Sequence, residues 1–193
     1  WLRATLVEPM RHSFEQLVGN YVGVAAQLAY VNAAVVVGNT SGMQTFYEPR
    51  RCDAPYHDAG EDSERCIVGF ETSTLVASTK QSFVRRHTEW LEGPPPIAKR
   101  AVVGVDWISL LKSQGAVSLG MLVVDAEGMD CDLIANFPFD ITIPEVILFE
   151  QAHCDSEQRQ HLHNFLTDIL GYIEAPGFVG HLEYDACYIR VAS

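Results

Sequence analysis

The sequence predicts an α/β fold in which a mostly parallel sheet is covered by helices on both faces. Two observations lead to this prediction. Short apolar runs alternate with helical patterns along the chain, and three of these runs end on a carboxylate before a helix. Strands buried on both faces of a parallel sheet read as continuous apolar runs, as these do. We therefore expect a three-layer α/β/α sandwich with right-handed crossovers.

The length and composition fit one globular domain. The 193 residues can bury a sizeable core, so we treat 1–193 as a single domain. No stretch approaches the ~20 apolar residues that span a bilayer, so we expect no membrane insertion. The formal net charge of −12 repels phosphate backbones, so nucleic acid is not an expected partner. Because Trp1 is an unusual first residue and no leader pattern follows it, we expect an N-terminally truncated domain.

The first strand, acid and helix stand near the start of the chain. Residues 5–7 form an apolar run that ends on Glu8 and Pro9. A helical pattern follows, with an apolar face made of Phe14, Leu17, Val18 and Tyr21. Residues 33–37 then predict a strand, and after a glycine-rich turn signal residues 44–47 are expected to return as the second strand of a hairpin.

The middle of the chain predicts loops around a short helix. Residues 48–64 carry prolines, glycine and charges, which is typical of a surface loop. Residues 80–90 fit a short helix, and the proline-rich break at 93–96 prevents it from continuing. A β-rich run at 101–105 follows, and Asp106 stands where an N-cap belongs before the next helix, which Gly115 is expected to close.

The second half repeats the pattern of strand, acid and helix twice. An apolar run at 121–124 is followed by spaced carboxylates and a helix at 129–135, and a second run at 146–149 ends on Glu150. Asp155 and Gln158 resemble a capping box. The apolar stripe of that helix is Leu162, Phe165, Leu166, Ile169 and Leu170, with Gly171 as its end. Residues 172–173 and 186–191 are expected to pair as antiparallel strands.

The carboxylates Asp125 and Glu127 are the main candidates for a functional site. Ligands of open α/β sheets bind beyond the carboxyl ends of the strands, where these residues are expected. The alternative role for both is capping of the helix that follows. Glu150 ends the other apolar run and has a solvated strand end as its alternative.

The cysteines and histidines predict no metal site. Five cysteines without a C-x-x-C pair are expected to be reduced, structural thiols, which favours a reducing compartment over secretion, although a disulfide between Cys52 and Cys66 stays an alternative. One group has suitable atoms for zinc, namely His153, Cys154, His161 and His163. The side chains of His161 and His163 would point roughly 200° apart on a helix. We therefore expect no metal ion at this group.

Several of these motifs, in this order, resemble the FkbM-type S-adenosylmethionine-dependent methyltransferases. The matching segments are Leu6-Val7-Glu8-Pro9 before Phe14-Glu15-Gln16-Leu17 and Asn20, Asn32-Ala33-Ala34-Val35 with Gly42, Val105-Asp106-Trp107, Val124-Asp125-Ala126-Glu127-Gly128-Met129-Asp130, and Val146-Ile147-Leu148-Phe149-Glu150. The family has a lysine where Val123 stands and a glutamate where Asp130 stands. Its first strand and glycine-rich cofactor turn would precede Glu8, where this sequence has seven residues, so the N-terminal strand is expected to be missing.

The resemblance implies a fold, a cofactor and site residues. The fold is a Rossmann-like methyltransferase sheet, mostly parallel with an antiparallel terminal hairpin. The cofactor is S-adenosylmethionine, with Glu8 accepting hydrogen bonds from its ribose hydroxyls and Asp125 nearby. Asp125 and Glu127 are then the catalytic residues, and Asp125 orients or deprotonates the acceptor hydroxyl. The expected acceptor is a small or glycan-like molecule.

Two other functions remain open. The missing glycine turn and Val123 also fit a non-catalytic accessory subunit, whose partner chains would complete the sheet. A Rossmann-like module for another nucleotide is the third alternative, although the sequence has no glycine-rich phosphate loop.

Overall fold

The computed structural model describes residues 3–24, 26–38, 42–50, 77–89, 96–115, 118–175 and 184–191. The chain divides into two compact units. The first comprises residues 1–34 and 42–104, and the second comprises residues 35–41 and 105–193. Each unit is described by itself. No helix in the described part of the chain is long and apolar enough to cross a membrane.

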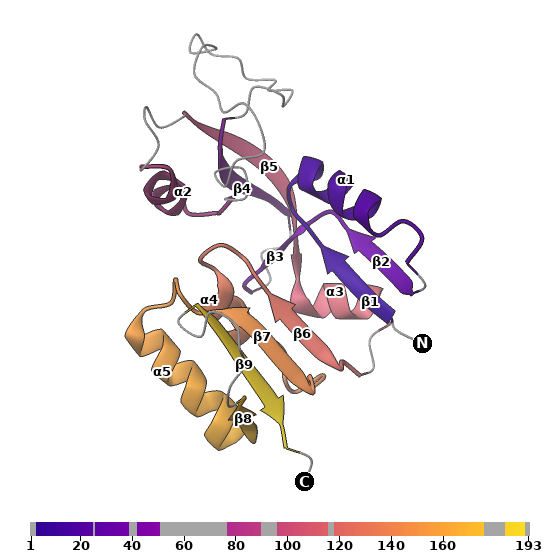
Figure 1. The fold of residues 1–193 in the computed structure, drawn as a ribbon, viewed down its shortest axis with the longest axis vertical. Helices are drawn as coiled ribbons and strands as arrows, with labels where there is room; N and C mark the ends of the chain where they lie inside the picture. The colour runs from indigo at the N-terminus through magenta and orange to yellow at the C-terminus, as the bar shows by residue number, and fades with distance from the viewer. Residues whose placement is uncertain are drawn as a thin grey trace. The chain divides into compact units, whose positions relative to one another are not determined.

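The first unit begins with a parallel pair of strands joined through a helix. The elements are β1 (Arg3–Val7), α1 (Arg11–Asn20) and β2 (Gln27–Val31). The register of the pair runs from Arg3 opposite Gln27 to Val7 opposite Val31. Figure 1 shows α1 lying alongside these two strands. The strand and the helix predicted at the start of the chain are therefore confirmed, whereas β2 was not predicted.

A three-stranded sheet follows in the chain, and two of its strands form a long antiparallel pair. The strands are β3 (Ala34–Val36), β4 (Gly42–Pro49) and β5 (Ile97–Asp106), in the order β3-β5-β4. The predicted hairpin between β3 and β4 is wrong, because β5 lies between them and pairs with β4 from Gly42 opposite Gly104 to Pro49 opposite Ile97. The turn signal between β3 and β4 predicts a change of chain direction. It does not predict which strand each of them pairs with.

The middle of the chain confirms the short helix and corrects one end of the predicted loop. Helix α2 (Gln81–Thr88) buries Phe83 and Val84 and packs against β4. Glu48 and Pro49, predicted to start the surface loop, instead end β4. Glu48 is only 5% exposed, and its Oε1 lies 2.6 Å from Nε of Arg100 on β5. Residues 51–64 and 93–95 lie outside the described residues.

The second unit is built on a mixed four-stranded sheet. Its strands are β6 (Met121–Val124), β7 (Val146–Glu150), β8 (Tyr172–Glu174) and β9 (Asp185–Arg190), in the order β6-β7-β9-β8. Strands β6 and β7 are parallel, and β9 runs antiparallel to both of its neighbours. The strands predicted at the two apolar runs and the antiparallel terminal pair are therefore confirmed, whereas burial on both faces is wrong for β6, where Met121 and Val123 are 50% and 58% exposed.

Three helices, labelled in Figure 1, and a π-helical turn complete the described part of the second unit. They are α3 (Trp107–Ser113), α4 (Asp130–Ala135), α5 (Ser156–Asn164) and the π-helical turn Phe165–Ile169. The predicted caps are present. Asp106 accepts the backbone N–H of Ser109 at 2.8 Å, and Asp155 and Gln158 form a reciprocal capping box. Ile169, expected in the buried stripe, is 71% exposed, because a π-helical turn carries more residues than an α-helical one and rotates the following side chains.

The core of this unit lies on one face of the four-stranded sheet. The buried side chains of that face include Leu122, Val124, Ile147, Phe149 and Tyr188. Helix α4 contacts β6 and β7 and contributes Leu133 and Ile134 to the buried core. Trp107 of α3 is fixed to α4 because its indole N–H donates to the carbonyl oxygen of Leu133 at 3.0 Å.

The fold class agrees with the sequence prediction at a coarse level. The described residues form a mixed α/β structure, and the order of strand, acid and helix occurs where it was expected. The sheets are smaller and more mixed than predicted, with two, three and four strands in the described part of the chain. The three-layer α/β/α sandwich with one continuous sheet therefore remains a prediction. The assignment of 1–193 to a single domain remains a prediction as well.

The cysteines differ from the prediction. Cys131 at the start of α4 and Cys154 before α5 form a disulfide, so the expectation of reduced thiols is wrong for this pair. The turns after β6 and β7 bring their Cα atoms to 6.0 Å from each other, within the range that a disulfide bridges. Cys187 is a buried free thiol, and burial raises its pKa. Cys52 and Cys66 lie outside the described residues.

Candidate functional site

The candidate site lies where β6 and β7 end. These strands are parallel neighbours with Val124 opposite Phe149, so their carboxyl ends meet at one edge of the sheet. Asp125 follows β6 directly and is exposed, whereas Glu127 and Glu150 are partly buried. The second unit therefore brings together the two main candidate carboxylates and Glu150, the further acid that the sequence offered.

A buried aspartate fixes the loop that carries Glu127. Asp130 is 1% exposed, and its carboxylate accepts the backbone N–H of Ala126 at 2.8 Å and that of Gly128 at 3.1 Å. Between these two residues, Glu127 has a φ of 48°, which non-glycine residues rarely adopt. The folded loop thus holds Glu127 in a sterically disfavoured conformation, a feature that is common at functional sites.

Burial and neighbouring charge perturb two of the carboxyl groups. Burial, followed by the negative charges of Asp125, Glu150 and Asp130, raises the pKa of Glu127 to about 7. Burial, followed by the charges of Asp125, Asp130 and Asp185, raises the pKa of Glu150 to about 7. Both groups therefore exchange protons near neutral pH, a property that general acids and bases require.

His153 adds an imidazole to the two glutamates. Its Nε2 lies 3.5 Å from Oε2 of Glu150. One ligand atom from each of Glu127, Glu150 and His153 lies within 4.8 Å of the other two. Within the described ranges, this is the one group of three or more acidic, cysteine or histidine side chains with that spacing.

The zinc group considered from the sequence does not assemble. Cys154 is bonded to Cys131, which removes the thiolate that a zinc ion would need. His163 Nδ1 lies 3.0 Å from the hydroxyl of Tyr188. His161 is an exposed residue of α5. Of the four, His153 is the residue that lies with Glu127 and Glu150.

Glu8 belongs to the first unit, at the carboxyl end of β1. Its Oε1 accepts the backbone N–H of Met10 at 2.7 Å, directly before α1, so its carboxylate supports the start of that helix. The backbone carbonyl groups of Glu8 and Pro9 accept the side-chain amide of Asn32 at 2.8 and 3.1 Å, and the amide thereby ties β1 to the end of β2. The role of Glu8 toward a ribose stays a prediction.

The sequence identified the acidic residues of this site but did not predict that they would lie together with His153. Asp125 and Glu127 were visible because they directly follow an apolar run. Glu150 carried the same signal at the end of the next run, and the parallel order of the two strands could have joined the three acids. His153 had no comparable signal, since its approach to Glu150 depends on the turn that leads into α5.

Known proteins do not identify the chain. No family model matches the sequence, and neither the curated proteins nor the solved structures contain a match.

Proposed function

We propose that the chain is an S-adenosylmethionine-dependent methyltransferase domain that transfers a methyl group to an oxygen of a small or glycan-like acceptor. The observation that carries the proposal is the meeting of Asp125, Glu127 and Glu150 beyond two parallel strands of the second unit. The motifs that resemble the FkbM-type methyltransferases support it. The antiparallel pair β8–β9 is also in keeping with the fold of that family.

The first unit offers a residue that suits the cofactor. The carboxylate of Glu8 accepts the backbone N–H of Met10, and a carboxylate is able to accept several hydrogen bonds. Two vicinal ribose hydroxyls can donate to such a group. The glycine-rich turn of the family would come from residues upstream of Trp1. When bound, the cofactor supplies an electrophilic methyl group.

Asp125 and Glu127 have separate roles in this proposal. Asp125 is exposed at the end of β6, so its carboxylate can accept a hydrogen bond from the acceptor hydroxyl and orient the oxygen for attack. As the oxygen gains the methyl group, its proton passes to Asp125. Glu127 keeps the edge acidic, and its pKa of about 7 lets it exchange protons at neutral pH.

Calorimetric titration with S-adenosylmethionine and S-adenosylhomocysteine tests the proposal. We expect one molecule to bind per chain, in the chain itself or in a form extended upstream of Trp1, and Glu8→Gln to weaken binding more than tenfold. Glu15→Gln is the matched control, because Glu15 is an exposed residue of α1 that pairs with Arg11. If neither form of the chain binds S-adenosylmethionine or S-adenosylhomocysteine, the proposal is wrong.

A second candidate function is a non-catalytic accessory subunit, which one surface of the second unit favours. An apolar row crosses the four strands on the face opposite the core, formed in register by Met121, Val146, Ile189 and Ile173. Three of these side chains are well exposed, at 50%, 41% and 50% for Met121, Ile189 and Ile173. Exposed apolar rows of this kind are typical of protein interfaces.

The same titration and a purification experiment separate the two functions. An accessory subunit would bind no cofactor and would co-purify with a partner chain in wild type but not in the variant Ile173→Lys. Cofactor binding by a monomeric chain would exclude this alternative.

A further inference from the structure

Two glutamates and a histidine of the second unit have the spacing of metal ligands. Their ligand atoms lie within 4.8 Å of one another, and His153 Nε2 is 3.5 Å from Glu150 Oε2. Ligand atoms that share one ion at about 2.1 Å lie roughly 3–4 Å apart. Small side-chain rotations are therefore enough to bring all three onto a common ion.

The chemistry of this group differs from that of an ordinary acidic surface. The imidazole of His153 supplies a nitrogen donor beside the two carboxylates, and both carboxylates are partly withdrawn from water. The surrounding charges that act on Glu127 and Glu150 come from Asp125, Asp130 and Asp185, all of them acidic. A cation at the centre of the three side chains would offset this repulsion.

The backbone that carries the three side chains is held in place. Asp130 binds two N–H groups of the loop around Glu127. The disulfide between Cys131 and Cys154 joins the first turn of α4 to the residue that follows His153. The loops after β6 and β7 are thus linked covalently next to the ligand groups, which lowers the entropic cost of assembling them.

We propose that Glu127, Glu150 and His153 bind a divalent ion of the first transition series, such as Mn²⁺ or Zn²⁺. Two carboxylate oxygens and one imidazole nitrogen match these ions, whereas Ca²⁺ and Mg²⁺ prefer oxygen ligands alone. Three protein ligands leave coordination positions for water or for an oxygen of a bound molecule. Asp125 is not one of the three ligands and stays available to the acceptor, whereas a bound ion would keep Glu127 ionised in place of the proton exchange described above.

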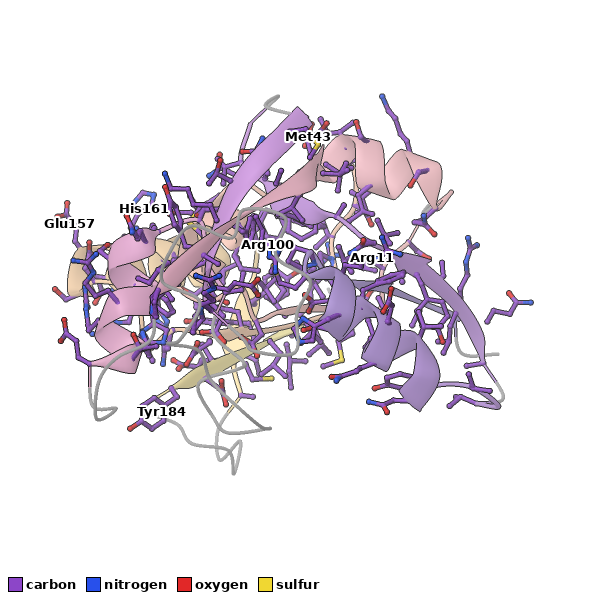
Figure 2. The ribbon with its side chains drawn as sticks, turned by 90° about the horizontal axis from the view of Figure 1, so that it is seen from above. Arg11, Met43, Arg100, Glu157, His161 and Tyr184 are labelled. Carbon is purple, nitrogen blue, oxygen red and sulfur yellow. A yellow bond between two sulfur atoms is a disulfide. The ribbon has the colours of Figure 1, made fainter. Side chains whose placement is uncertain are left out.

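Metal titration of the chain tests this site. After dialysis against EDTA and then metal-free buffer at pH 8, MnCl₂ is titrated and followed by electron paramagnetic resonance, and ZnCl₂ is titrated by calorimetry. We expect one tight site per chain, and we expect Glu127→Gln and His153→Gln each to weaken binding more than tenfold. Glu157→Gln is the matched control, because Glu157 is an exposed glutamate of α5 that points outward (Figure 2).

Circular dichroism of each variant checks that its fold is retained, and His153 is a suitable second position because it is itself exposed. Equal affinity in the wild type and both site variants would overturn the proposal, since the ion would then bind elsewhere. Absence of a tight site in the wild type for both ions would overturn it as well.

Discussion

Replacing Glu127 by glutamine should make the metal-free protein more stable at alkaline pH. Burial and three neighbouring acids raise the pKa of Glu127 to about 7. A carboxyl group whose pKa is raised on folding stabilises the folded state while it is protonated, and this contribution is lost as the pH rises from about 4.5 to 7. Glutamine resembles the protonated form and does not ionise. The variant should therefore keep the stability that the wild type loses when Glu127 ionises.

The expected size of the effect follows from the pKa of Glu127. A rise from the ordinary 4.5 to about 7 corresponds to about 3 kcal/mol. Because Glu127 is only partly buried, solvent screens part of this energy and we expect about 1.5 kcal/mol.

Urea unfolding at pH 5 and pH 8.5, in EDTA, measures the effect. Wild type should lose stability between the two pH values, and Glu127→Gln should lose about 1.5 kcal/mol less. Glu157→Gln, at an exposed position of α5, should follow wild type. A variant with the same pH dependence as wild type, or with lower stability at pH 8.5, would refute the reasoning.

Three further substitutions test the packing of the second unit, each followed by urea unfolding. Replacing Cys131 and Cys154 together by alanine should cost about 3 kcal/mol, because the disulfide closes a loop with a sequence separation of 23; equal stability of the wild type with and without reductant would contradict this. Trp107→Phe should cost about 2 kcal/mol, since the carbonyl oxygen of Leu133 loses its buried donor, and a change below about 0.5 kcal/mol would argue against that bond. Asp106→Ala should cost about 1 kcal/mol through loss of the α3 N-cap, with Asp106→Asn expected to recover most of it.

Local signals account for the parts of the fold that the sequence predicted. The capping box of Asp155 and Gln158, the N-cap Asp106 and the left-handed Gly115 each act within a few residues, so the sequence carries them directly. The apolar runs of β6 and β7 were equally clear in the sequence, although β6 is the first strand in the order β6-β7-β9-β8 and exposes Met121 and Val123. From these two strands, the position of Asp125 and Glu127 at one sheet edge could be predicted.

The features that the sequence did not reveal depend on contacts between distant residues. Strand β5 separates β3 from β4, and no local pattern states which strands will pair. The bond between Cys131 and Cys154 requires two loops to meet, and their spacing in the sequence resembles no known framework. The approach of His153 to Glu150 depends on the same meeting of loops.

The position of a bound ion tests the site at the ends of β6 and β7 most directly. Crystals of the metal-free protein would be soaked in MnCl₂, and the anomalous difference density of manganese would be measured. We predict one strong peak about 2.1–2.3 Å from a carboxylate oxygen of Glu127, a carboxylate oxygen of Glu150 and Nε2 of His153. Manganese bound only at other positions, with these three side chains unliganded, would contradict the assignment.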